Sequence, residues 1–405
     1  MITDNQTNKI YFSPALEKEC PMLWNGIHKA LMERGIRHGF LMNNPRYFWC
    51  RDYMPIQIAD DKFVSYNFKP DYLLEFEKRY RFALDCDIEK ICYDMNYPTT
   101  KLDLILDGGN VVKCGDAIVM TEKVFLENRD ISRAEVEKIL RDTLQCDILF
   151  LPWDKKEKYG HSDGIIHYAG EGKILMTNYQ DYDTKIACEM EKRLAKKFDV
   201  ITLSYKAKRK HYSNWAYINF LQTEKLIMVP QLGLKEDEQA LEQISAVFTD
   251  CEVIGIPALE AVRKGGALNC ISWNIKDNGT LPRKYKYPLD EIERKTVELF
   301  PEFLGCNLMQ PIRTFMKDSS KYPSLKEIKD AQHAIRSMDS SADAKINEGG
   351  VAVSIPKKYV MRDGTPIDVN SEKAHQWLEY SPVFHSIIEM LTDLTMNGHF
   401  EFTTE

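Results

Sequence analysis

Hydrophobic residues recur with two periods along the first two-thirds of the chain. A helical period, in which apolar side chains return every three or four residues, is seen at Leu23, Ile27 and Leu31. This pattern predicts helices over residues 23–35, 132–144, 183–198 and 236–248. Short apolar runs predict strands over residues 36–42, 63–68, 102–106, 117–120, 148–151, 174–177, 200–203, 226–229 and 252–256. Because strands and helices alternate, we expect an α/β fold.

The pattern changes after residue 277. A turn-rich segment, 278–282, is followed by helical periods over residues 289–304, 325–337 and 371–396 and by strand-like runs at 350–355 and 359–361. At 405 residues the chain is longer than one average domain. We therefore expect a domain over residues 1–277 and a mostly helical C-terminal extension or accessory subdomain over residues 278–405. The sequence of the extension indicates no particular chemistry.

Composition and net charge limit the kinds of molecule that the protein is expected to bind. A hydrophobic content of 44% and a charged content of 28% are ordinary for globular proteins and exclude a disordered or fibrous chain. The net charge of −7 gives no global electrostatic reason to bind nucleic acid or an anionic membrane. We expect the basic run 206–211 to be a solvated loop. A homo-oligomer formed through the helical extension stays open.

The N-terminus and the cysteines indicate a cytoplasmic protein. Residues 1–7 are polar and do not form a signal peptide, and no run approaches the roughly 18 apolar residues of a spanning helix. The ten cysteines are scattered without a C-x-x-C pair, which is typical of thiols in a reducing compartment. Since the histidines do not cluster with the cysteines at zinc spacing, we expect no structural zinc site.

Four residues with reactive or charged side chains lie at regular distances. Asp52, Asp107 and Asp163 are separated by 55 and 56 residues, and Cys270 follows after 107, about twice that interval. A missing fifth mark falls near Ala216. Such spacing is typical of a repeated supersecondary unit, and five units around an axis would bring one side chain from each to the centre. The alternative is that four selected residues look periodic without a repeat.

Two segments contain candidates for covalent chemistry. In Gly160-His161-Ser162-Asp163-Gly164, His161 and Asp163 share one face of an extended segment, and a carboxylate beside a histidine suits a general acid or base. A solvated turn with an incidental ion pair explains the same residues. Cys270 follows paired glycines and precedes an apolar run, so it is either a nucleophile activated by His161 or a buried structural cysteine.

Two further segments contribute carboxylates. Trp49-Cys50-Arg51-Asp52 holds an acid among aromatic residues, where it needs a cation, and Arg51 would serve if the pair is internal. Leu106-Asp107-Gly108-Gly109-Asn110 is a strand that ends in an acid and two glycines, a sequence that also suits an ordinary hairpin turn.

Taken together, the four segments supply one thiol, one imidazole and three carboxylates. Anions raise the pKa of a thiol and repel a developing oxyanion, so this set suits a protease poorly. It suits a substrate that carries its own positive charge. A guanidinium is planar, permanently charged and rich in N–H donors, and two carboxylates can clamp it bidentately.

These segments, with Tyr217-Ile218-Asn219-Phe220 and Gly265-Gly266-Ala267-Leu268-Asn269-Cys270, resemble the ordered motifs of the agmatine deiminase and bacterial-type peptidylarginine deiminase family. The resemblance covers about residues 10–277. It implies the pentein fold of guanidino-group-modifying enzymes, a five-bladed α/β propeller with pseudo-fivefold symmetry.

The resemblance also implies roles for individual residues. Cys270 would be the nucleophile, His161 the acid and base, and Asp52 and Asp163 the guanidinium clamp. Asp107 stands where the family usually has Glu, and it would orient the histidine or bind the edge of the substrate.

Other positions of these motifs are expected to contact substrate or to depart from the family. Trp49 and Asn110 are candidate substrate-binding residues. Trp49, Tyr53 and Trp273 are candidates for a wall along an alkyl stem, or else belong to the core. Asn269 stands where many relatives have His.

The resemblance implies hydrolysis of a small guanidine through a covalent thiouronium adduct on Cys270, without a metal or organic cofactor. Agmatine, converted to N-carbamoylputrescine and ammonia in polyamine (putrescine) biosynthesis, is the expected substrate. Peptidylarginine, free arginine or methylated arginine deimination and amidino transfer remain alternatives on the same site. A noncatalytic pentein binding protein is the alternative of another class.

Overall fold

The computed structural model describes residues 1–41, 46–74, 86–95, 97–206 and 214–278, with the backbone of residues 345–346 and 353–354. The chain divides into two compact units, residues 1–278 and 279–405. In the second unit, β16 (Lys345–Ile346) and β17 (Val353–Ser354) pair antiparallel, and β17 falls inside the strand predicted over 350–355. The three helices and the strand 359–361 predicted for the extension lie outside the described residues, as does most of the basic run 206–211.

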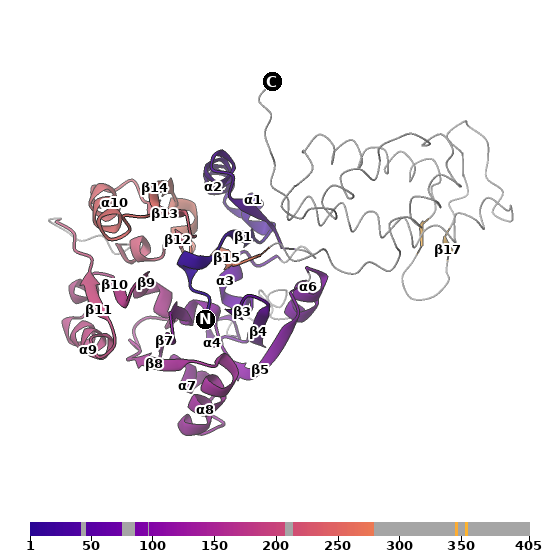
Figure 1. Ribbon diagram of the computed structural model, residues 1–405, viewed down its shortest axis with the longest axis horizontal. Coiled ribbons are helices and arrows are strands. Elements are labelled where there is room, and N and C mark those ends of the chain that lie inside the picture. Colours follow the sequence, from indigo (N-terminus) through magenta and orange to yellow (C-terminus); the bar gives the residue numbers. More distant parts are fainter. Residues whose placement is uncertain are drawn as a thin grey trace. The chain divides into compact units, whose positions relative to one another are not determined.

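Five three-stranded sheets form the first unit, and Figure 1 shows them arranged around a common centre. Each sheet has an inner, a middle and an outer strand. The middle strand pairs antiparallel with the inner strand and parallel with the outer strand. In this order the sheets are β15 (Ser272–Ile275), β1 (Lys9–Phe12) and β2 (Arg37–Phe40); β3 (Ile56–Ala59), β4 (Lys62–Asn67) and β5 (Thr99–Ile105); β6 (Val112–Cys114), β7 (Ala117–Thr121) and β8 (Asp147–Leu151); β9 (Ile166–Gly170), β10 (Lys173–Met176) and β11 (Asp199–Thr202); and β12 (Leu221–Gln222), β13 (Leu226–Gln231) and β14 (Glu252–Pro257).

Each connection between a middle and an outer strand contains one main helix, the longest described there, as a parallel pair requires. These helices are α2 (Pro21–Glu33), α6 (Ile88–Asp94), α8 (Arg133–Leu144), α9 (Thr184–Leu194) and α10 (Glu236–Val247). The first sheet is completed from the other end of the domain, because β15 pairs with β1 in the register Lys9↔Ile275. The predicted α/β class and the fivefold repeat are confirmed.

Helix α8 illustrates why these segments fold locally. The Ser132 side chain accepts a hydrogen bond from the Glu135 backbone N–H and caps the first turn. Val136, Leu140 and Leu144 recur every four residues and are all buried against the sheets. Sequence periodicity and tertiary burial therefore agree at this helix.

A short turn precedes each inner strand. Four of these turns are helical, α3 (Cys50–Tyr53), η2 (Gly108–Asn110), η3 (Ser162–Gly164) and η5 (Asn214–Ile218), and the fifth spans residues 268–271. The turns α3, η2, η3 and η5 contact one another in sequence order. The predicted candidates Asp52, Asp107, Asp163 and Cys270 lie in or directly before them. Remaining short elements are η1 (Asp4–Gln6), α1 (Ala15–Glu19), α4 (Asp71–Leu74), α7 (Lys123–Glu127), η4 (Tyr179–Asp181) and α11 (Leu259–Val262).

Three of the inner strands contribute to a largely buried polar group, here called the axial cluster (Asp4, Arg51, Lys113, His167 and Gln222). Asp4 comes from η1, and its carboxylate lies 3.0 Å from Lys113 Nζ and 3.9 Å from an Arg51 guanidinium nitrogen. His167 Nε2 lies 2.8 Å from Gln222 Oε1. The N-terminal segment thus supplies the negative charge that two buried cations need.

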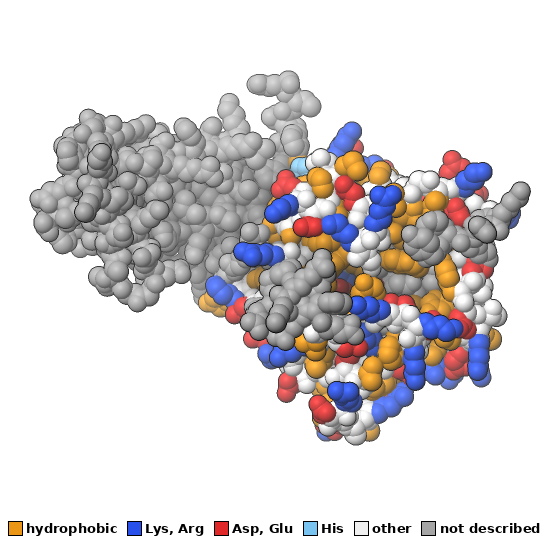
Figure 2. Space-filling model, turned by 180° about the vertical axis from the view of Figure 1, so that it is seen from behind, with side chains coloured by type: hydrophobic (Ala, Val, Ile, Leu, Met, Phe, Trp, Pro, Cys, Tyr) orange, Lys and Arg blue, Asp and Glu red, His pale blue; other side chains and the backbone are white. Residues whose placement is uncertain are grey.

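The visible surface of the first unit is mixed in charge. Figure 2 shows acidic and basic side chains interspersed on one face, with hydrophobic side chains between them. Within the residues that the structure describes, no helix is both long enough and apolar enough to cross a bilayer. The nine cysteines of the described part are all free.

Candidate active site

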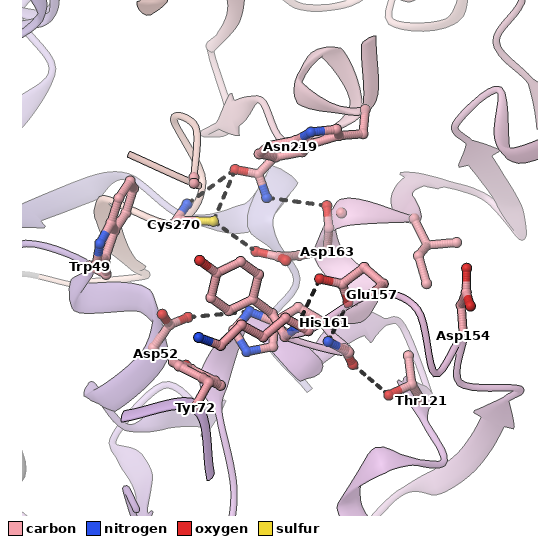
Figure 3. A pocket seen from close by; sticks show the side chains of 18 of the residues that line it. Trp49, Asp52, Tyr72, Thr121, Asp154, Glu157, His161, Asp163, Asn219 and Cys270 are labelled. Carbon is pink, nitrogen blue, oxygen red and sulfur yellow. Dashed lines mark hydrogen bonds and ion pairs between the residues drawn. The ribbon is translucent and has the colours of Figure 1, made fainter. Parts of the chain in front are cut away.

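A cavity of about 700 Å³ lies where the turns before the inner strands meet. Figure 3 shows Cys270, Asp163, His161 and Asp52 directed into it. Cys270, Asp163 and Asp52 lie on turns of three different sheets, and His161 directly precedes η3. The repeated topology is therefore what brings residues more than 100 positions apart into one pocket.

Cys270 is held in place by neighbouring turns. Its backbone C=O accepts a hydrogen bond from Arg51 N–H at 3.1 Å, and its backbone N–H donates to Asn219 Oδ1 at 3.3 Å. The thiol Sγ lies 3.3 Å from Asn219 Oδ1 and 3.7 Å from Asp163 Oδ2. The sulfur faces the cavity with an amide oxygen and a carboxylate as its polar neighbours.

Asp163 is oriented by two asparagines. Asn269 Nδ2 donates to Asp163 Oδ2 at 2.8 Å, and Asn219 Nδ2 donates to the Asp163 backbone C=O at 3.2 Å. Asn269 precedes Cys270 in the chain, so the same turn fixes both the thiol and the carboxylate beside it. In this chain the neutral Asn269 supplies that donor at any pH.

Asp52 lies on α3, where the Tyr66 hydroxyl donates to its backbone C=O at 2.8 Å. Trp49, at the start of this turn, lines the cavity and packs closely against Gly266. A Cβ at Gly266 would clash with the Trp49 ring, which explains one of the paired glycines before Cys270.

His161 is bracketed by two carboxylates. Its Nε2 lies 2.9 Å from Asp107 Oδ2, and its Nδ1 lies 3.8 Å from Asp52 Oδ1. Gly109 makes this approach possible, because a Cβ there would clash with His161 Nδ1 and with Asp52 Oδ1. Asp107 is almost completely buried and does not line the cavity. It therefore contacts the imidazole from behind, and the shorter Asp side chain reaches it.

The three carboxyl groups of the site can carry more negative charge than the one nearby cation, His161, balances. Burial raises the pKa of Asp52 to about 8; the His161 charge opposes this shift, while Asp107 and Asp163 add to it. Burial likewise raises the pKa of Asp163. Burial, and then the charges of Asp163 and Asp52, raise the pKa of the Cys270 thiol well above its ordinary value. Burial and the neighbouring acids therefore favour the protonated forms of the Cys270 thiol and of Asp52 as long as no further cation is bound.

His161 responds in the opposite way. Burial by itself lowers the pKa of an imidazole, but Asp52 and Asp107 outweigh that effect and raise it to about 10. The imidazole is thus protonated at neutral pH and able to act as an acid.

The remaining candidates separate into cavity wall and support. Trp49 lines the cavity, whereas Tyr53 and Trp273 are buried in a hydrophobic cluster and donate to backbone carbonyls. Asn110 does not line the cavity. Its side-chain oxygen accepts from Thr121 N–H at 2.8 Å, so the structure places it as a support of strand β7 instead of a substrate contact.

Asn219 was not predicted as a site residue. It lies 56 residues after Asp163, which is the interval of the repeat, three positions beyond the expected mark near Ala216. The spacing therefore indicated the right turn but not the residue. An amide at the fifth position, where the other turns carry acids or the thiol, gave no reactive group to recognise.

Comparison with known proteins places this chain in a family of guanidino-group-modifying enzymes and its fold among the penteins. The family model for Porphyromonas-type peptidyl-arginine deiminase matches residues 26–275, more than half of the chain. The chain therefore belongs to this family.

Individual relatives are distant. The agmatine deiminase of Pseudomonas aeruginosa (strain LESB58) is 24% identical over 238 residues, which are 49% of this chain and 60% of the relative. The chain thus matches less than two-thirds of the length of such relatives. Two solved structures share the fold. One is the agmatine deiminase of Enterococcus faecalis, with a TM-score of 0.53 and 19% identity over 67% of this chain and 94% of that one. The other is a C. jejuni agmatine deiminase with substrate bound, with a TM-score of 0.56 and 18% identity over 68% and 95%.

Proposed function

We propose that the protein is a guanidine deiminase that hydrolyses a small guanidino substrate, with agmatine preferred. Membership of the family supports guanidine chemistry, and relatives named agmatine deiminases support the choice of substrate. The proposed reaction converts agmatine and water to N-carbamoylputrescine and ammonia.

The observation that carries this proposal is the charge imbalance around Cys270. Asp52 and Asp163 are buried at the cavity, and the His161 imidazole lies 3.8 Å from Asp52. A guanidinium bound between the two carboxylates would restore their ionised forms and supply the missing positive charge. The same charge would stabilise the Cys270 thiolate, so the thiol gives up its proton to solvent and the nucleophile forms when the substrate is present.

The proposed chemistry has two steps. The Cys270 thiolate attacks the guanidinium carbon, His161 gives its proton to one amino nitrogen, and the C–N bond breaks to release ammonia. Water then donates a proton to His161 and attacks the thiouronium carbon. The C–S bond breaks, and the ureido product and Cys270 are released. Asp107, on the far side of the ring, stabilises the imidazolium in both steps.

A panel of guanidines tests the proposal. The purified protein is incubated with agmatine, free arginine, methylated arginine and an arginyl peptide, and ammonia and ureido product are measured. We expect agmatine to give the highest kcat/KM. An added primary amine tests amidino transfer, because it would yield a new guanidine in place of the ureido product. A silent panel, with a Cys270 of ordinary alkylation rate, would contradict the proposal and favour a noncatalytic binding protein.

A further inference from the structure

Lys123 is a buried lysine that the proposed chemistry does not use. Its side chain is 1% exposed at the start of α7, a position that a lysine adopts only when its ammonium group is well paired. The Nζ atom donates to the backbone carbonyls of Lys158 at 3.1 Å and Tyr159 at 2.9 Å. It also lies 2.9 Å from Asp71 Oδ1 and 3.6 Å from Glu127 Oε1.

The two carbonyls belong to the segment that leads into His161. Gly160, between them and the histidine, packs against the Lys123 side chain, and a Cβ there would clash with it. Glu157 holds the same segment from its other side by accepting from the Tyr159 and Gly160 backbone N–H groups. The backbone path into His161 is therefore fixed by one buried cation and one carboxylate.

The other partner of Lys123 belongs to the wall of the cavity. Asp71 begins α4, whose Tyr72 and Leu73 line the cavity. The Lys123 ammonium group lies 4.9 Å from the centre of the Tyr72 ring, and this ring meets the His161 ring edge-on at 6.0 Å. One ammonium group thus contacts both the wall and the segment that carries the acid.

Glu127 competes little for this ammonium group. Burial, followed by the charge of Asp107, raises the pKa of Glu127 to about 8, so the carboxyl is mostly protonated at neutral pH. Asp71, which is 53% exposed, is then the main counter-charge of Lys123.

We propose that Lys123 is a positioning residue that ties the His161 segment to the α4 wall through Asp71, and so sets the placement of the catalytic imidazole and the fit of the substrate together. The kinetic consequences of this inference rest on the proposed function. The contacts of Lys123 with Asp71 and with the segment before His161 do not depend on the substrate.

The first test uses Asp71→Asn, because Asp71 is 53% exposed and we expect a half-exposed ion pair to contribute little to folding. The matched control is Asp60→Asn, which breaks an equally short ion pair, 2.9 Å to Lys276, at a 49% exposed carboxylate that does not line the cavity. We expect Asp71→Asn to raise KM by up to about fivefold with kcat nearly unchanged, the size of one partly exposed ion pair. The control should change neither.

The second test uses the double variant Lys123→Met/Glu127→Gln, which removes the ammonium group and leaves no buried acid unpaired, because the remaining partner, Asp71, is 53% exposed to solvent. Because the His161 segment then loses its donors, kcat should fall by about tenfold or more, in contrast to the KM effect of Asp71→Asn. Glu127→Gln alone mimics the protonated carboxyl and should behave as the unaltered protein.

Hydrogen exchange separates this inference from the choice of substrate. In both test variants, amides of residues 71–74 and 157–161 should exchange faster together, while those of β7 stay slow and report an intact fold. Unchanged exchange in either segment of the double variant would contradict the claim that Lys123 links the two segments. Faster exchange with unchanged kcat and KM would overturn the positioning role. Absence of turnover in the unaltered protein would contradict the proposed function. Hydrogen exchange alone would then test whether Lys123 links the two segments.

Discussion

The cavity at the turns before the inner strands and the axial cluster are two buried polar groups, and they differ in how their charges are balanced. In the axial cluster, burial of Asp4 is outweighed by Lys113 and Arg51, and the pKa of Asp4 falls well below its usual range. In the cavity, burial raises the pKa of Asp52 to about 8 although His161 lies nearby. In the axial cluster one carboxylate is paired with two cations of the chain, whereas in the cavity three carboxylates share one cation, His161.

The difference indicates which cluster binds a ligand. A folded protein gains nothing from a buried carboxyl that must stay protonated, so an uncompensated set of acids is expected where a partner supplies the charge. The axial cluster needs no such partner, because burial also lowers the pKa of His167 to about 4 and leaves its ring neutral. The two clusters should therefore respond oppositely to substitution.

The largest expected effect comes from the nucleophile. Cys270→Ser should reduce ammonia release by at least about 10⁴-fold, because a hydroxyl is a far weaker nucleophile than a thiolate. Guanidine binding should persist, since Asp52 and Asp163 remain. Ammonia release and equilibrium binding of agmatine measure the two separately. Cys188→Ser, at an exposed thiol, is the control and should leave both unchanged. Turnover retained in Cys270→Ser would contradict a covalent intermediate on Cys270.

The second prediction sets the two acids against each other. Asp4→Asn should destabilise the protein by about 3–5 kcal/mol, because Lys113 and Arg51 are left buried without their counter-charge. Its thermal midpoint should fall by roughly 10 °C, with the remaining activity per folded molecule preserved.

Asp52→Asn should show the reverse. The folded-state pKa of Asp52 lies above its unfolded value, so ionisation favours the unfolded state and the carboxyl costs stability between the two pKa values, a range that includes pH 7. Replacing it should leave the thermal midpoint unchanged or raised, while kcat/KM falls by about 10²-fold or more with one side of the clamp gone. Calorimetry and steady-state rates on both variants decide the comparison. A midpoint lowered equally in both would mean that the clusters are not different in kind.

The sequence predicted the middle and outer strands of the sheets better than the inner strands. Middle and outer strands such as β7 and β13 are apolar runs, and the predicted ranges meet them. None of the five inner strands was among the predicted strands. They span only two to five residues, and β3, β6 and β9 carry Gln57, Lys113 and His167, which are buried. Each of these polar side chains has a partner far away in the sequence, Lys276, Asp4 and Gln222 respectively, and no local period records such pairs.

The same reasoning explains the site. Cys270, His161, Asp52 and Asp163 were found because their residue types and spacing follow the repeat. The role of Asn110 was assigned from a motif, but its side chain satisfies the backbone of Thr121. Asn219 and Lys123 were missed because their importance lies in contacts with residues 35 to 56 positions away.

A third prediction concerns Asn219. Asn219→Asp keeps the size of the side chain but places a negative charge 3.3 Å from Cys270 Sγ. The pKa of the thiol should rise further, and kcat should fall by about tenfold to a hundredfold with the ascending, acid-side limb of its pH profile displaced to higher pH. Asn128→Asp is a control at another buried asparagine, outside the cavity. It should lower the thermal midpoint but leave the pH profile in place. An unchanged profile in Asn219→Asp would contradict the contact.

The smallest effect, and the most direct measure of the charge imbalance, is the proton released on binding. In the empty site Asp52 is protonated below about pH 8, and a guanidinium beside it favours the carboxylate, so binding should release up to one proton at pH 7. If His161 loses its proton instead, the sign is the same. The affinity of Cys270→Ser for agmatine should therefore rise up to about tenfold per pH unit between pH 6 and 8 and level off above. Calorimetric titrations in buffers of different ionisation enthalpy count the proton. Heats independent of the buffer, together with a pH-independent affinity, would show that the cavity acids were already ionised and that the two clusters are balanced alike.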